Sequence, residues 1–81
     1  MTRAGRVVEV VARALADRPE AVRVTEREAR GQTFVELSMA PGDLGRVIGR
    51  QGRTAAAVRT IANLAAELDG VKVTVDFRDD H

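Results

Sequence analysis

The chain has 81 residues, no cysteine, two aromatic residues and a formal net charge of +1. This length allows one small domain, and the missing cysteines exclude disulfides, thiolate metal sites and a thiol nucleophile. No apolar run is long enough for a secretion signal or a membrane span, so we expect a soluble, cytoplasmic protein with one domain over residues 1–81, ordered from about 3 to 77.

The first half of the chain predicts a helix followed by a hairpin. Between residues 3 and about 17, four apolar residues form one helical stripe: Val7, Val8, Val11 and Leu15. Pro19 ends this helix, because the residue before a proline avoids helical backbone angles. Apolar residues then alternate with polar ones around residues 22–25 and 34–39, which predicts two strands. The short turn between them, residues 29–32, favours an antiparallel hairpin.

The second half predicts a short helix, a long helix and a last strand. Pro41, Gly42 and Asp43 favour the start of a helix of about two turns, and Gly49 is its expected left-handed terminator. The long helix covers residues 53–68. Its apolar residues predict this buried stripe: Val58, Ile61, Leu64, Ala65 and Leu68. Alternation over residues 71–77 predicts the last strand, and residues 78–81 are expected to form a solvated tail.

A GxxG sequence between the two helices is the one motif with a chemical interpretation. It consists of Gly49, Arg50, Gln51 and Gly52. Glycine permits positive φ and close approach of another backbone, and the free N–H groups that open the next helix attract phosphate. Residues 41–60 contain four arginines and one aspartate, a net charge of +3, which leaves −2 for the rest of the chain. A phosphate-facing loop and a plain turn both remain possible on spacing and charge alone.

The run VIGRQG, after a strand and before a long helix, resembles the signature of the K-homology (KH) RNA-binding domain. The element order is similar to the prokaryotic type II form. The chain length, the stretch LSMAPGDLGRVIGRQGRTAAAVRT and the closing KVTV resemble the KhpA family of small bacterial KH proteins over nearly the whole chain. This resemblance implies an α+β fold of order α-β-β-α-α-β, with a three-stranded sheet and three helices packed on one of its faces.

The resemblance also implies an RNA chaperone or post-transcriptional regulator that binds about four nucleotides of single-stranded RNA in a groove beside the loop. It links the family to cell shape and cell-wall homeostasis, with the KH-containing protein KhpB as partner. A homodimer or a heterodimer is expected, because one groove binds weakly and pairing raises the effective concentration. Val47 is expected in the core. The expected RNA-binding residues are Leu44, Arg46, Ile48, Gly49, Arg50, Gln51, Gly52 and Arg53.

Other functions have less support in the sequence. Catalysis could use only one serine, Ser38, and one histidine, His81, so we expect no enzyme activity. We also expect no metal site, no other cofactor, no small-molecule substrate and no membrane partner. Asp79, Asp80 and His81 are interpreted as a tail rather than as metal ligands. Two alternatives stay open. One is a helix-turn-helix DNA binder, and the other is a protein-docking adaptor that uses the alanine-rich face of the long helix.

Overall fold

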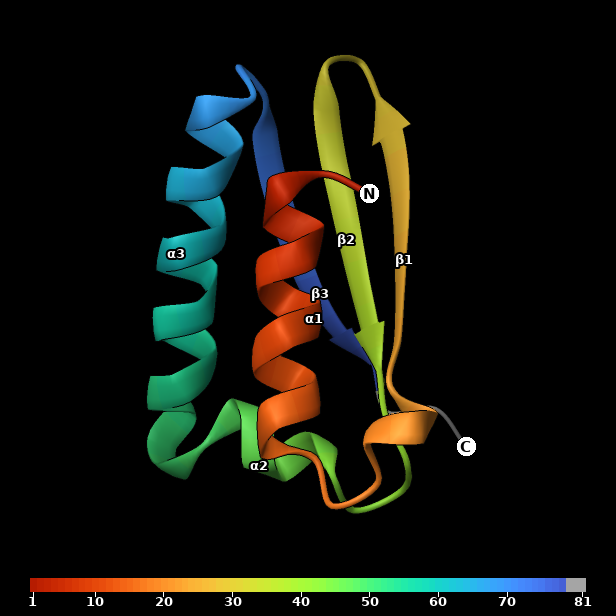
Figure 1. Cartoon of the computed structure of the whole chain (residues 1–81). Coiled ribbons are helices and arrows are strands. Elements are labelled where there is room, and N and C mark those ends of the chain that lie inside the picture. Colours follow the sequence, from red (N-terminus) through yellow and green to blue (C-terminus); the bar gives the residue numbers. More distant parts are fainter. Residues whose placement is uncertain (79–81) are drawn as a thin grey trace.

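A computed structural model describes residues 1–78 of the chain. The elements are α1 (Arg3–Leu15), β1 (Arg23–Ala29), β2 (Gln32–Ser38), α2 (Leu44–Ile48), α3 (Arg53–Leu68) and β3 (Lys72–Arg78), with single 3-10 turns at Pro19–Ala21 and Arg50–Gly52. This order confirms the prediction (Figure 1). Arg78 belongs to β3 rather than to a tail, and the predicted tail residues Asp79, Asp80 and His81 lie outside the described residues. No helix within residues 1–78 combines the length and apolarity needed to cross a membrane.

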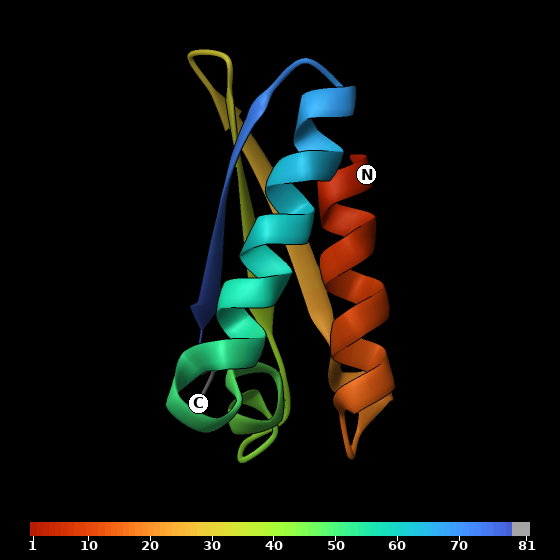
Figure 2. The ribbon, with the colours of Figure 1, turned by 90° about the vertical axis from the view of Figure 1, so that its left-hand side faces the viewer.

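The three strands form one sheet in the order β1-β2-β3. Strands β1 and β2 are antiparallel, and the register places Ala29 opposite Gln32. The two residues between them, Arg30 and Gly31, have φ values of 54° and 77°, which is typical of a two-residue hairpin turn. Strands β2 and β3 are parallel, and α2 and α3 form the crossover between them. Helices α1 and α3 cover one face of the sheet, while α2 lies at one end (Figures 1 and 2).

Helix α1 is anchored to the sheet at its first turn. The Thr2 hydroxyl caps the helix by accepting a hydrogen bond from the Gly5 amide, at 3.1 Å. The same hydroxyl and the Thr2 amide each donate to the Glu26 carboxylate on β1, both at 2.7 Å. The helix ends at Leu15, two residues before the predicted end, because the backbone of Ala16 is already extended.

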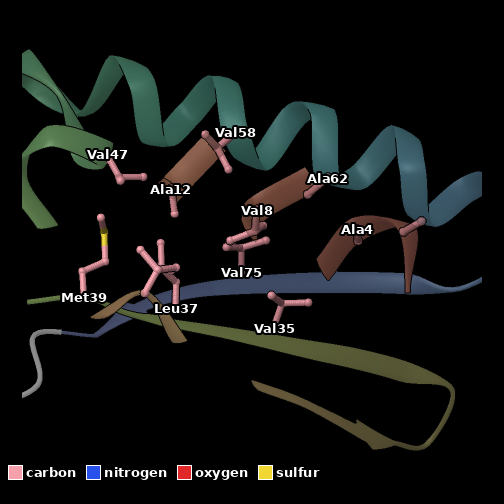
Figure 3. Packing of buried hydrophobic residues seen from close by; sticks show 12 residues of the cluster. Ala4, Val8, Ala12, Val35, Leu37, Met39, Val47, Val58, Ala62 and Val75 are labelled. Carbon is pink, nitrogen blue, oxygen red and sulfur yellow. The ribbon is translucent and has the colours of Figure 1, made fainter. Parts of the chain in front are cut away.

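The core lies between the sheet and the helical layer (Figure 3). Its largest fully buried side chains include Val8, Leu37 and Val47, and Val35 and Val75 supply the sheet side. Val47 is therefore a core residue, as expected from the sequence.

The predicted buried stripe of α3 is wrong at three positions. Ile61, Leu64 and Leu68 are 48%, 57% and 73% exposed. Besides Val58, the residues of α3 that are buried are alanines: Ala55, Ala62 and Ala66. The helix α1 turns a similar face of small residues, Ala4 and Ala12, toward the same core (Figure 3). Small residues let two helices approach closely, so the bulky residues of α3 lie on its outer face instead.

Candidate nucleic-acid interface

Helix α2 is fixed to the rest of the molecule by a buried aspartate. Asp43 is 5% exposed and precedes the helix. Its Oδ2 accepts a hydrogen bond from the Arg18 amide at 2.9 Å, and its Oδ1 lies 3.7 Å from Nε of Arg46. A buried carboxylate needs such partners to offset its desolvation. The contact therefore ties the α1–β1 connection to the helix that leads into the GxxG loop.

Helix α2 has five residues and is shorter than the two turns predicted. Val47 faces the core and Leu44 packs against the core cluster from its edge. Ile48 is half-buried and directly precedes the loop. Of the two apolar residues expected to contact RNA, Leu44 thus contributes to packing, while Ile48 is partly exposed next to Gly49.

Gly49 ends α2 by a hydrogen bond from its amide to the Gly45 carbonyl, at 2.9 Å. Its φ of 75° is positive as expected, but its ψ of 174° is extended, so it is not the left-handed terminator predicted. A methyl group at Gly49 would lie 2.8 Å from Cβ of Thr54 and nearer still to the hydroxyl of that residue. Glycine is thus required here both by the backbone angles and by the close approach of Thr54.

Gly52 has a different role, although its φ of 71° is also positive. Apart from its chain neighbours Gln51 and Arg53, no residue within 1–78 has an atom within 4 Å of the position that a Cβ would take, so its outer side is open. Gln51, between the glycines, also has a positive φ of 58°, which is uncommon for a residue with a side chain. The sharp turn therefore consists of two successive left-handed residues, with one open side.

The loop leaves two backbone donors available. The amides of Gly49 and Gly52 bind the carbonyls of Gly45 and Gly49, and the Arg53 amide binds the Arg50 carbonyl. The amides of Arg50 and Gln51 have no hydrogen-bond partner among residues 1–78, since Gly49 belongs to no helical turn and no acceptor elsewhere in this part of the chain binds them. Two free donors at the N-terminal end of the 16-residue helix α3 are suited to bind an anion.

Three of the four arginines of the basic segment surround this turn. Arg50 and Arg53 are exposed, and Nη2 of Arg53 donates to the side-chain oxygen of Gln51 at 3.0 Å. Arg46 is exposed on α2, where its Nε faces Asp43. The fourth, Arg59, lies farther along α3, where its Nε donates to the carbonyl of Val75 on β3 at 3.3 Å. The structure therefore brings all the predicted RNA-binding residues to one end of the molecule, with Leu44 at the core edge.

A pocket lies between α3 and β3, on the side where the resemblance implies a groove, but its lining residues are not among those predicted to bind RNA. Its volume is about 180 Å³, and it is lined by Arg59, Asn63, Val73, Thr74 and Val75. Arg59 and Asn63 are four residues apart and share one side of the helix. This spacing could have shown from the sequence that the two side chains lie together. Which strand edge they face follows only from the pairing of β3 beside β2. Together the loop and the pocket offer phosphate donors and a partly apolar wall beside them.

A family model described as the KH domain of KhpA/KhpB matches residues 6–77 of this chain. The RNA-binding protein KhpA of Caldanaerobacter subterraneus subsp. tengcongensis is 43% identical over 73 residues, which cover 90% of this chain and 97% of that protein. The RNA-binding protein KhpA of Halalkalibacterium halodurans is 44% identical over 73 residues, covering 90% and 96%. That of Leifsonia xyli subsp. xyli is 44% identical over 70 residues, covering 86% and 90%.

Among solved structures, two of the protein Era share this fold. One is Aquifex aeolicus Era bound to GDP and AlF4-, and the other is Era in complex with MgGDPNP and a part of 16S ribosomal RNA. Each match has a TM-score of 0.64 at 19% identity, and covers 94% of this chain and 29% of Era. The resemblance inferred from the GxxG run and the element order is thus confirmed, and the chain belongs to the KhpA/KhpB family of KH domains.

Proposed function

We propose that this chain binds single-stranded RNA through the GxxG loop and the groove between α3 and β3. The observation that carries the proposal is the pair of free amides at Arg50 and Gln51, in a turn with an open side at Gly52. Curated relatives that match most of the chain are named RNA-binding proteins, which supports the same ligand.

Binding would divide between phosphates and bases. A phosphate on the free amides also lies near the guanidinium groups of Arg46, Arg50 and Arg53, which add charge-assisted hydrogen bonds. Bases would contact the half-buried Ile48 and the pocket beside β3, because the chain has no exposed aromatic platform; Phe77, near that pocket, has its ring covered by Arg59 at 4.7 Å. KH grooves clamp about four nucleotides in this way.

The test is fluorescence anisotropy with a labelled single-stranded RNA of mixed sequence. The double variant Arg50→Asp with Gln51→Asp places two carboxylates against the phosphate, so affinity should fall at least about a hundredfold. Arg6→Asp on α1 reverses one charge far from the loop and should change affinity by about twofold or less. Both variants should keep the wild-type far-ultraviolet circular dichroism, since no core residue changes. Equal binding by the loop variant and the wild type contradicts the proposal.

Salt dependence separates RNA binding from incidental contact. Three neutralised phosphates predict that log affinity falls with log salt at a slope of about two for a single strand. A flat response favours the adaptor alternative, in which protein docking is the function. The helix-turn-helix alternative has less support, because α2 has only five residues and packs through Val47 into the core.

We further propose that the outer face of α3 pairs with a second copy of the chain. Ala57, Ile61, Leu64 and Leu68 follow one another at spacings of four, three and four residues, the spacing of a coiled-coil seam, and none of them is charged. A charged partner finds no counter-charge on this seam, whereas a second copy offers the same apolar surface across a two-fold axis. Two paired grooves would then bind one RNA more tightly than either alone.

The finer expectations that come from the family resemblance stay predictions. These are the RNA chaperone or regulatory role, the link to cell shape and cell-wall homeostasis, and a heterodimer with KhpB. The cytoplasmic location, expected from the composition, also stays a prediction. A KhpB heterodimer is compatible with the α3 seam, because one family model describes the KH domains of both proteins. We also propose that the chain acts by binding rather than by catalysis, with Ser38 placed within β2 as a strand residue.

A further inference from the structure

The pocket beside β3 lies farther along α3 than the GxxG loop, and no loop residue lines it. Arg59 follows the first residue of α3, Arg53, by six positions, a rise of roughly 9 Å along the helix. The pocket lies on the free side of β3, since the other side of this strand pairs with β2. An RNA strand whose phosphate sits on the loop therefore has a base within reach of the pocket. The inference below rests on the proposed RNA-binding function.

Arg59 is fixed in this pocket before any ligand arrives. Its Nε donates to the Val75 carbonyl at 3.3 Å, and its guanidinium carbon lies 4.7 Å from the centre of the Phe77 ring. These two contacts hold the plane of the guanidinium group from the edge and from the face. A side chain held in this way loses little further conformational freedom on binding.

The N–H groups on the two terminal nitrogens of Arg59 are free to donate hydrogen bonds. Among residues 1–78, no acceptor binds Nη1 or Nη2 of Arg59, and the residue is exposed. These nitrogens form a planar fork that donates two parallel hydrogen bonds and accepts none. The fork is suited to a ligand edge that has two adjacent acceptors.

We infer that Arg59 gives the groove a preference for guanine over adenine. The edge of guanine presents O6 and N7, two acceptors that match the fork, whereas adenine presents N7 beside an amino group that donates. Adenine in the same position sets donor against donor. The pocket, at about 180 Å³, is lined on the helix side by Asn63 as well, whose amide can bond to the rest of the base edge.

The test compares RNA oligomers of uridines that carry one central guanine, adenine or 7-deazaguanine. We expect wild type to bind the guanine oligomer roughly tenfold to a hundredfold more tightly than the adenine oligomer, with 7-deazaguanine in between because it lacks one acceptor. Arg59→Lys keeps the charge but loses the fork, so the three oligomers should then bind within about twofold of one another. Arg53→Lys, on the same helix outside the pocket, should keep the preference.

The outcomes distinguish this inference from the proposed function. If RNA binds with loop-dependent affinity but without guanine preference, or if Arg59→Lys keeps the preference, the role of Arg59 is wrong and the RNA-binding function stands. If no oligomer binds and the loop variant behaves like the wild type, the proposed function itself fails. Far-ultraviolet circular dichroism and the thermal midpoint of Arg59→Lys, expected to match the wild type, confirm that the fold is kept.

Discussion

The first turn of α3 and its outer face are two surfaces of one helix with opposite chemistry. The first turn meets the GxxG loop, where glycines with positive φ leave two amides free and arginines gather. The outer face carries the seam of Ala57, Ile61, Leu64 and Leu68, with no charge. Free amides favour an anion, and an exposed apolar seam favours a like surface. The comparison indicates that RNA binding and self-association can be removed independently.

The largest effect is expected from charges placed on the seam. Leu64→Asp with Leu68→Asp should abolish self-association, because two copies would bury four carboxylates without partners. Sedimentation analysis should give the monomer mass for this variant and the dimer mass for the wild type. Binding of an RNA short enough for one groove should stay within about twofold.

Lys72→Asp at the start of β3 makes the same change in net charge and serves as the control. This variant should remain dimeric. A seam variant that stays dimeric, or a wild-type chain that is monomeric at high concentration, contradicts the pairing.

A second contrast lies between the buried and the exposed side of α3. Ala62 has no exposed surface, so Ala62→Leu overfills the contact between the helix and the core and should lower the free energy of unfolding toward the upper end of about 1–3 kcal/mol. Leu64→Ala on the outer face should change it by about 0.5 kcal/mol or less. Urea denaturation measures both in a Leu68→Asp background, because one carboxylate per copy on the seam is also expected to prevent pairing. A similar decrease in unfolding free energy for the two variants would show that the outer face of α3 also packs within the monomer.

The two glycines of the loop should differ in a smaller but diagnostic way. Gly49→Ala meets Thr54 as well as an unfavourable φ, and should cost about 2 kcal/mol of unfolding free energy. Gly52→Ala meets open space and should cost about 1 kcal/mol from its φ alone. Because the open side of Gly52 is where a sugar-phosphate backbone would approach, RNA affinity should fall about tenfold in Gly52→Ala. Unchanged affinity in a folded Gly52→Ala protein would place the RNA elsewhere.

The order of elements and the loop could be predicted because local signals determine them. Alternating valines predict β3, and Gly31 in the turn at residues 29–32 predicts the hairpin. The GxxG glycines predict positive φ, which the structure confirms at Gly49 and Gly52. The conformation of Gly49 differs from the left-handed terminator that was predicted. Its contact with Thr54 could not be predicted either, because it depends on how two helices meet rather than on residue spacing.

The packing of α3 could not be predicted from periodicity. The helix carries two apolar stripes of similar spacing, one of alanines with Val58 and one of larger residues. Hydrophobicity alone favours the larger residues as core, whereas the short distance to α1 requires the small ones. The contacts of Arg59 could not be predicted for a related reason, since Val75 and Phe77 approach it only after β3 pairs beside β2.

The most direct test of the central claim is an NMR titration of the isotope-labelled chain with a short single-stranded RNA. If the free donors of the loop hold the phosphate, the amide resonances of Arg50 and Gln51 should shift most, followed by that of Gly52 and then by Arg59 and its neighbours on β3. The resonances of Ile61, Leu64 and Leu68 should stay nearly unchanged. Shifts centred on the outer face of α3, with a silent loop, would contradict the account.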